Sequence, residues 1–136
     1  MSYHGQSPSR HWFGKGLLVL GLLLVANSAY VAAFSTPDLF YVANDLIHPF
    51  LGLLVAILLA AFAVRHRTFF ASRTAKVSLL LLAMAGGFGV YLAIAGMTRP
   101  HSMALYLHVG FAIAGLFLLL IHLRTKIEDR KSKIEN

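Results

Sequence analysis

Four long apolar segments follow one another along the chain, separated by charged residues and prolines. Each has about 20 residues, so a helix rising about 1.5 Å per residue would cross a hydrocarbon core about 30 Å thick. The connections between the segments are short, which favours antiparallel neighbours. The pattern therefore predicts an all-α fold, a transmembrane four-helix up-down-up-down bundle. Its expected spans are about 16–36, 46–64, 77–97 and 103–123.

The predicted spans account for nearly the whole chain. The composition is 58% hydrophobic and 12% charged, against about 45–50% and about 25% in soluble domains. We therefore expect a single integral membrane domain over residues 1–136, with polar tails at 1–12 and 125–136. The first apolar segment is long for a signal peptide and lacks a clear cleavage site, so we interpret it as a retained helix.

Lysine and arginine lie almost entirely on one side of the predicted bundle. Of the 12 basic residues, only Arg99 falls in a connection on the other side. Basic residues accumulate on the cytoplasmic side of membrane proteins, so we expect a bacterial inner-membrane protein with both termini in the cytoplasm. This topology explains the net charge of +7 better than nucleic-acid binding does. Membrane lipid is therefore an expected partner, and nucleic acid is not.

The chain contains no cysteine. Disulfides, thiolate metal sites and covalent c-type haem attachment are therefore excluded, because each of them requires cysteine. Any cofactor must be held by other ligands, and histidine is the main candidate.

Two predicted helices each carry a pair of histidines. His48 opens the second span and His66 closes it, whereas His108 lies early in the fourth span and His122 at its end. At about 100° per residue, the first pair is five whole turns apart and the second is about 40° short of four turns. Both members of each pair therefore share a helix face. Because the second and fourth helices run parallel, His48 and His108 lie toward the outer side and His66 and His122 toward the inner side.

Paired histidines at similar depth could supply both axial ligands of a haem iron. Ionisable residues inside a membrane are costly and usually functional, which favours this interpretation for His48 and His108. The inner histidines, His66 and His122, match less well in depth. The rise from His48 to His66 is about 27 Å, whereas the rise from His108 to His122 is about 21 Å. His66 also lies among arginines. The competing interpretation for each histidine is an anchor at the membrane interface.

Several neighbouring residues could contribute to a haem site. Gly52 and Gly110 would leave flat surfaces near the ligands, although small residues also allow close packing of membrane helices. Arg99 and His101 lie in the outer connection, as surface residues or neighbours of haem propionates. Pro49 is expected in the first turn of the second helix, where proline sacrifices no hydrogen bond.

The segments "HPFLGLLVAILLAAFAVRHR" and "LYLHVGFAIAGLFLLLIHLR" resemble the membrane subunits of b-type cytochromes. The resemblance covers the second to fourth helices, about three-quarters of the chain. It implies that His48 and His108 ligate the iron of an outer haem b, and His66 and His122 that of an inner one, so that one haem or two are bound. It also implies an electron-transfer subunit, not itself an enzyme, that works with a quinone pool, a c-type cytochrome and other subunits of a redox complex.

Two other classes of protein remain open at this point. In a chlorophyll-type pigment-binding subunit, a single histidine ligates each magnesium and no pairing is needed. In a structural or assembly subunit, the helices pack within a larger membrane complex and the histidines lie at interfaces.

A bis-histidine haem leaves no open iron position, so the haem interpretation predicts one-electron transfer instead of substrate activation. No quinone site is assigned.

Overall fold

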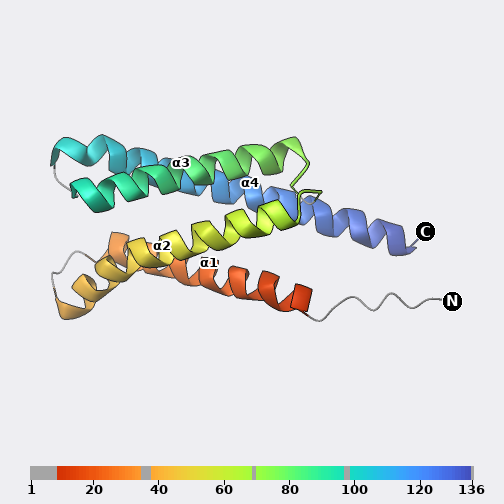
Figure 1. The fold of residues 1–136 in the computed structure, drawn as a ribbon, viewed down its shortest axis with the longest axis horizontal. Helices are drawn as coiled ribbons and strands as arrows, with labels where there is room; N and C mark the ends of the chain where they lie inside the picture. The colour runs from red at the N-terminus through yellow and green to blue at the C-terminus, as the bar shows by residue number, and fades with distance from the viewer. Residues whose placement is uncertain (1–8, 35–37, 69, 97–98, 136) are drawn as a thin grey trace. The chain divides into compact units, whose positions relative to one another are not determined.

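The computed structural model describes residues 9–34, 38–68, 70–96 and 99–135, without the side chains of residues 9–13, 99, 130 and 133–135. Over these residues the chain is entirely helical apart from its connections (Figure 1). The elements are α1 (Ser9–Ala33), α2 (Leu39–Arg65), α3 (Arg73–Ala95), the 3-10 turn η1 (Arg99–His101) and α4 (Ser102–Glu135). The predicted all-α fold class is confirmed.

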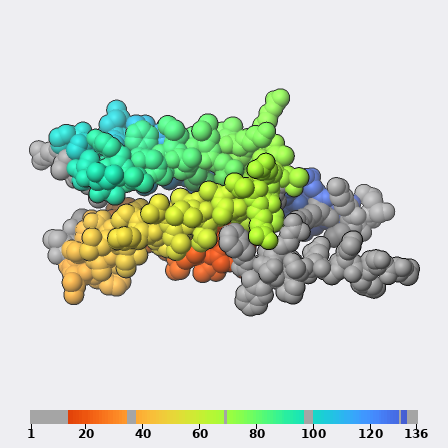
Figure 2. Space-filling view, in the orientation of Figure 1, coloured from red at the N-terminus to blue at the C-terminus, as the bar shows by residue number. Residues whose placement is uncertain are grey.

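Each α-helix contains a segment long and apolar enough to cross a membrane. Within the described residues these segments are Gly14–Ala33, Leu39–Arg65, Arg73–Ala95 and Ser102–Asp129. Exposed apolar side chains follow α2 and α3 along their length, including Phe50, Ile57, Leu80 and Ile94. Figure 2 shows the two helices in space-filling form. Such surfaces suit contact with lipid, as expected of an integral membrane protein.

The chain divides into two compact units, residues 1–65 and 66–136. In the first unit α1 packs against α2, and in the second α3 packs against α4. Consecutive helices run in opposite directions within each unit. Each unit is therefore a helical hairpin, as the up-down order of the spans predicted.

The helix α2 begins well before the expected span. The carboxylate of Asp38 accepts the backbone N–H of Tyr41 at 2.7 Å, and its carbonyl accepts the N–H of Val42 at 3.1 Å. This is the pattern of an N-cap, which satisfies backbone donors at a helix start. Pro49 consequently lies in the interior of α2 and not in its first turn. The prediction for Pro49 was wrong because the cap at Asp38 starts the helix earlier.

The cap gives a testable contribution to stability. Asp38→Ala should destabilise the first hairpin by about 1 kcal/mol, because the N–H of Tyr41 loses its acceptor. Asp38→Asn keeps a side-chain oxygen at the same place and should stay close to wild type. Denaturant unfolding of the purified protein in detergent, followed by circular dichroism, measures the difference. Equal losses in both variants would mean that charge, not capping, is what Asp38 contributes.

Ser72 and Gly96 define the two ends of helix α3. Ser72 caps α3 by accepting the N–H of Ala75 at 3.2 Å. Gly96 ends α3 with φ 79°, a backbone conformation that favours glycine, and its N–H donates to the carbonyl of Leu92.

The helix α4 continues to Glu135, so most of the predicted polar tail 125–136 is helical. Of the other predicted tail, residues 9–12 belong to α1 and residues 1–8 lie outside the described residues.

Helices α3 and α4 meet along a seam of positions seven residues apart. On α3 the buried members are Ser78, Ala85 and Leu92. The facing series begins at His101, the last residue of η1, and continues on α4 with His108, Gly115 and His122. A seven-residue spacing keeps one helix face toward its neighbour. We call these residues the α3–α4 seam. It places His101 against Tyr91, His108 against Ala85, and His122 against Ser72, the N-cap of α3.

Helices α3 and α4 approach closely at Gly115. The hydroxyl of the fully buried Ser78 donates to the carbonyl of Gly115 at 2.8 Å. A Cβ added to Gly115 would lie 2.8 Å from the Cγ of Leu82 and 3.1 Å from its backbone nitrogen. Only a residue without a side chain fits there, which explains this glycine by packing and not by cofactor binding.

Candidate functional site

His48 in α2 faces helix α1 of its own hairpin. Its Nδ1 lies 3.1 Å from the amide oxygen of Asn27 and 3.5 Å from the hydroxyl of Ser28. The Ser28 hydroxyl donates to the carbonyl of Leu24 at 2.7 Å. His48 is half-buried at this contact, so the first hairpin holds its imidazole from the α1 side.

The orientation of the Asn27 amide follows from its other contacts. Its Nδ2 donates to the side-chain oxygen of Asn44 at 2.9 Å and to the backbone oxygen of Asn44 at 3.2 Å. The Asn27 oxygen therefore faces His48 and accepts a hydrogen bond from Nδ1. A neutral imidazole protonated at Nδ1 carries its lone pair at Nε2, the nitrogen that can then bind a metal.

His108 in α4 is held in a similar way by α3. Its Nδ1 lies 2.8 Å from the backbone oxygen of Ala85. A carbonyl only accepts, so Nδ1 must carry the hydrogen and Nε2 the lone pair. Gly89 provides the space for the ring, because a Cβ at that position would lie 3.0 Å from Cε1 and 3.1 Å from Nδ1 of His108.

His122 is the most deeply buried of the candidate ligands, with 2% of its surface exposed. Its Nδ1 lies 3.1 Å from the hydroxyl of Ser72, and its ring lies 6.2 Å from that of Phe70. A hydroxyl can both donate and accept, so Ser72 is compatible with either tautomer of His122. This differs from the contacts of His48 and His108, where the acceptor is an amide oxygen.

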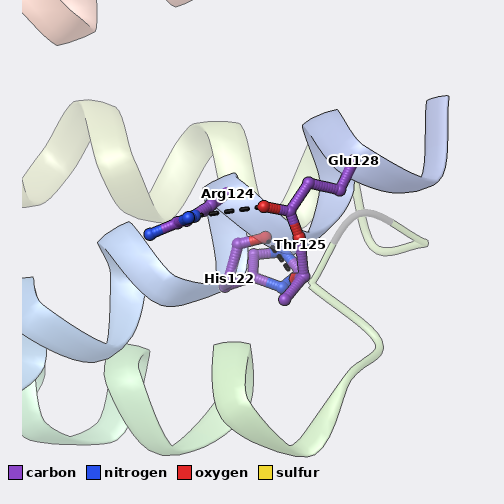
Figure 3. A network of polar contacts seen from close by, with 4 residues as sticks. All are labelled: His122, Arg124, Thr125 and Glu128. Atoms are coloured by element: carbon purple, nitrogen blue, oxygen red, sulfur yellow. Dashed lines mark hydrogen bonds and ion pairs between the residues drawn. The ribbon is translucent and has the colours of Figure 1, made fainter. Parts of the chain in front are cut away.

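The α4 backbone continues without a break past His122 (Figure 3). The hydroxyl of Thr125 donates to the carbonyl of His122 at 2.9 Å. Beside it Arg124 and Glu128, four positions apart along the helix, form an exposed ion pair with Nε and Oε1 3.1 Å apart. Such exposed pairs support a helix only weakly. The contacts of the buried His122 ring are with Ser72 and Phe70, in the segment that leads into α3.

The other candidate residues have different surroundings. His66 follows the last residue of α2, and its carbonyl accepts the N–H of Phe70 at 3.4 Å. Gly52 is in ordinary contact with α1, with its Cβ position 4.0 Å from Leu24. Gly110 is exposed, with nothing within 4 Å of its Cβ position. It lies about 200° around α4 from His108, on a different face of the helix.

The outer connection contains the last two candidates. His101 ends η1, and its Nδ1 donates to the carbonyl of Gly96 at 3.1 Å. Its ring meets that of Tyr91 edge-on, with 5.5 Å between centroids. The backbone of Arg99 belongs to η1, but its side chain lies outside the described residues.

The structure brings some predicted site residues together. His108 contacts Ala85 within α3, and His122 contacts Ser72, the N-cap of α3, so both lie on the side of α4 that faces the same neighbour. His48 belongs to the first unit, and His66, His108 and His122 to the second. Among the described residues, no three His, Asp or Glu side chains form a group that could hold a metal ion. A bis-histidine haem iron takes two ligands from the protein and the rest from the porphyrin.

The partners of the imidazoles were missed by sequence reasoning. Asn27 and Ser28 interrupt an apolar segment, a signal that a polar partner is near, but it does not say which residue they contact. The Ala85 carbonyl gives no signal at all, because every residue has one. Comparisons with protein-family models, with curated proteins and with solved structures found no match to this chain.

Proposed function

We propose that the chain is a haem b-binding membrane subunit that carries electrons, with His48 and His108 as the axial ligands of one haem. One observation carries the proposal. Both imidazoles donate Nδ1–H to an oxygen of the neighbouring helix, at 3.1 and 2.8 Å. Both therefore have the tautomer that ligates through Nε2. Metal-binding histidines characteristically donate their other N–H to a carbonyl, which fixes the ring and increases its basicity.

The donor set fits haem b in its chemistry. Two neutral imidazoles and no cysteine match non-covalent bis-histidine ligation, which supplies one-electron transfer when the haem is bound. The chain's own contribution is to hold the rings: Asn27 fixes His48 from α1, and Ala85 with Gly89 fixes His108 from α3. Both imidazoles are half-buried, and apolar surroundings would strengthen these hydrogen bonds.

A second haem at His66 and His122 is proposed with less structural support. His66 lies beyond the end of α2, and Ser72 does not fix the tautomer of His122. Arg99 and His101 remain candidates near the propionates, as does Gly52 beside the porphyrin. Gly110, also proposed beside the porphyrin, lies on a different face of α4 from His108 and has no contact that supports this role. We further propose a quinone pool, a c-type cytochrome and other redox subunits as partners, in a bacterial inner membrane with both termini in the cytoplasm.

Optical spectroscopy of the purified chain tests the ligand assignment. The reduced-minus-oxidised spectrum should show the bands of low-spin haem b, and these should disappear in His48→Ala and in His108→Ala. Removing either ligand leaves the iron without one axial nitrogen. Ser78→Ala is the matched control, because it removes a buried polar contact of the same seam but no imidazole. It should retain the haem.

Several results would contradict this assignment. A folded, colourless wild-type chain would exclude haem binding, and unchanged haem in both histidine variants would move the ligands elsewhere. Iron per chain separates one haem from two. If two are bound, His122→Ala should remove one of them and leave the haem of His48 and His108.

One observation favours a structural subunit as the second candidate. The imidazole of His122 is almost completely buried and meets Ser72 and Phe70, which is how polar residues join membrane helices without a cofactor. If the chain is a structural subunit, the purified protein should be folded and colourless, and His122→Ala should lower only its free energy of unfolding. The spectrum of a magnesium chlorin would instead identify a pigment-binding subunit.

A further inference from the structure

We propose that Asn27 is a positioning residue for His48 that lowers the reduction potential of the haem. This inference rests on the proposed function. The contact that carries it is the hydrogen bond from Nδ1 of His48 to the amide oxygen of Asn27, 3.1 Å long. Asn27 is expected to act on the iron only through the imidazole, without touching the haem itself.

Asn27 is a polar residue in an apolar helix, where burying its amide costs free energy unless the amide is hydrogen-bonded. It belongs to the membrane-length segment Gly14–Ala33. Both hydrogens of the Asn27 amide are directed at oxygens of Asn44, and its oxygen is directed at His48. The amide is thus satisfied by α2 alone, at two residues one helical turn apart.

The amide cannot be turned over without losing these contacts. Asn44 donates its own Nδ2 to the carbonyl of Phe40 at 2.8 Å, so its side-chain oxygen faces Asn27. A flipped Asn27 would put oxygen against the two oxygens of Asn44 and nitrogen against the Nδ1 of His48. The network therefore fixes Asn27 as the acceptor and His48 as the donor.

The hydrogen bonds form a chain with one direction. His48 donates to Asn27, Asn27 donates to Asn44, and Asn44 donates to the carbonyl of Phe40. Hydrogen bonds aligned in this way polarise one another, and a low dielectric strengthens the effect. The result is a strong pull on the Nδ1 hydrogen, which raises the electron density at Nε2. A more electron-rich ligand stabilises ferric over ferrous iron, so the potential falls.

Ser28 offers a matched comparison on the same helix. Its hydroxyl also approaches Nδ1 of His48, but at 3.5 Å, and it already donates to the carbonyl of Leu24. A contact of that length is a weak hydrogen bond at best. Ser28→Ala therefore changes α1 next to Asn27 while leaving the main acceptor of His48 in place.

Redox titration of the purified full-length chain tests the inference. Asn27→Leu should shift the haem potential to a more positive value and weaken haem binding by about 10- to 100-fold, the usual effect of losing such a partner. Ser28→Ala should keep the wild-type potential. Asn27→Asp should restore a potential at or below wild type, because a carboxyl group protonated on the side of Asn44 donates to it and presents its other oxygen to His48.

Each outcome decides the matter. If Asn27→Leu binds no haem, Asn27→Asp decides alone: a potential at or below wild type supports the inference, and a raised potential overturns it. If haem is present and depends on His48 but Asn27→Leu titrates like Ser28→Ala, the inference fails and the proposed function stands. A wild-type chain without haem overturns both.

A measurement on the haem-free chain gives an independent check. The imidazole nitrogen chemical shifts of His48 in ¹⁵N-histidine-labelled protein report which nitrogen carries the hydrogen. Wild type and Ser28→Ala should show the Nδ1–H tautomer, and Asn27→Leu should lose that preference. An unchanged tautomer in Asn27→Leu would show that Asn27 does not set it.

Discussion

Gly115→Ala should destabilise the α3–α4 hairpin, whereas Gly110→Ala on the same helix should not. The added methyl at 115 would lie 2.8 Å from the Cγ of Leu82 and 3.1 Å from its backbone nitrogen. The backbone nitrogen of Leu82 cannot rotate away as a side chain can, so α3 and α4 must separate. The hydrogen bond from Ser78 to the Gly115 carbonyl then lengthens. Overpacking of this kind costs about 1–3 kcal/mol.

The comparison with Gly110 isolates this packing cost. Both substitutions gain about 1 kcal/mol of helix propensity, and nothing lies within 4 Å of a Cβ at 110. The difference in unfolding free energy between the two variants, measured by denaturant titration in detergent, should therefore equal the cost of the clash. Equal stabilities would show that α3 and α4 do not approach closely at Gly115.

The helical fold could be predicted from the sequence because its cause is simple. Water-free surroundings require every backbone group to be paired internally, and an apolar segment of about 20 residues can do so only as a helix. Of the described residues in the predicted spans, all but Phe34 and Gly96 lie on helices, and residues 35–36 and 97 lie outside the described residues. The ends of the helices were less predictable, because polar side chains and not apolar runs set them.

The start of α2 illustrates this limit. Apolar content suggested a beginning near residue 46, with Pro49 in the first turn. The carboxylate of Asp38 instead caps a helix that begins at Leu39. The proline then lies within the helix and leaves the carbonyl of Asp45 without its usual backbone donor. Asn44, which lies outside the predicted span 46–64, is part of α2 and of the network that holds His48.

The candidate site could be predicted in its histidines but not in their partners. Angular arithmetic placed His108 and His122 on one face of α4; His108 contacts α3 at Ala85, and His122 contacts the α3 N-cap, Ser72. The seven-residue series from His101 to His122 was also present in the sequence, although its meaning depended on the packing of α3. What sequence could not supply was the Ala85 carbonyl against His108, or the role of Gly89 as the space beside that ring.

Gly89→Ala should loosen the second axial ligand of the proposed haem, whereas Gly87→Ala should leave it unchanged. A methyl at 89 would lie 3.0 Å from Cε1 and 3.1 Å from Nδ1 of His108. Both distances are shorter than ordinary van der Waals contact, so the ring must move. Its hydrogen bond to the Ala85 carbonyl, now 2.8 Å, would lengthen. Haem affinity should then fall by about 10- to 100-fold, as for other losses of a ligand's hydrogen-bonding partner.

Gly87 is the matched control because it lies two residues away on α3, is exposed, and has nothing within 4 Å of its Cβ position. Titration of haem into both purified variants, followed by absorbance, gives the affinity ratio. Unfolding measurements on the haem-free proteins separate loss of the ligand from loss of the hairpin: Gly89→Ala should bind haem weakly even where its helices remain folded. Equal affinities in the two variants would mean that the contact between Gly89 and His108 does not orient an iron ligand, and His108 would then be a packing residue of the α3–α4 seam.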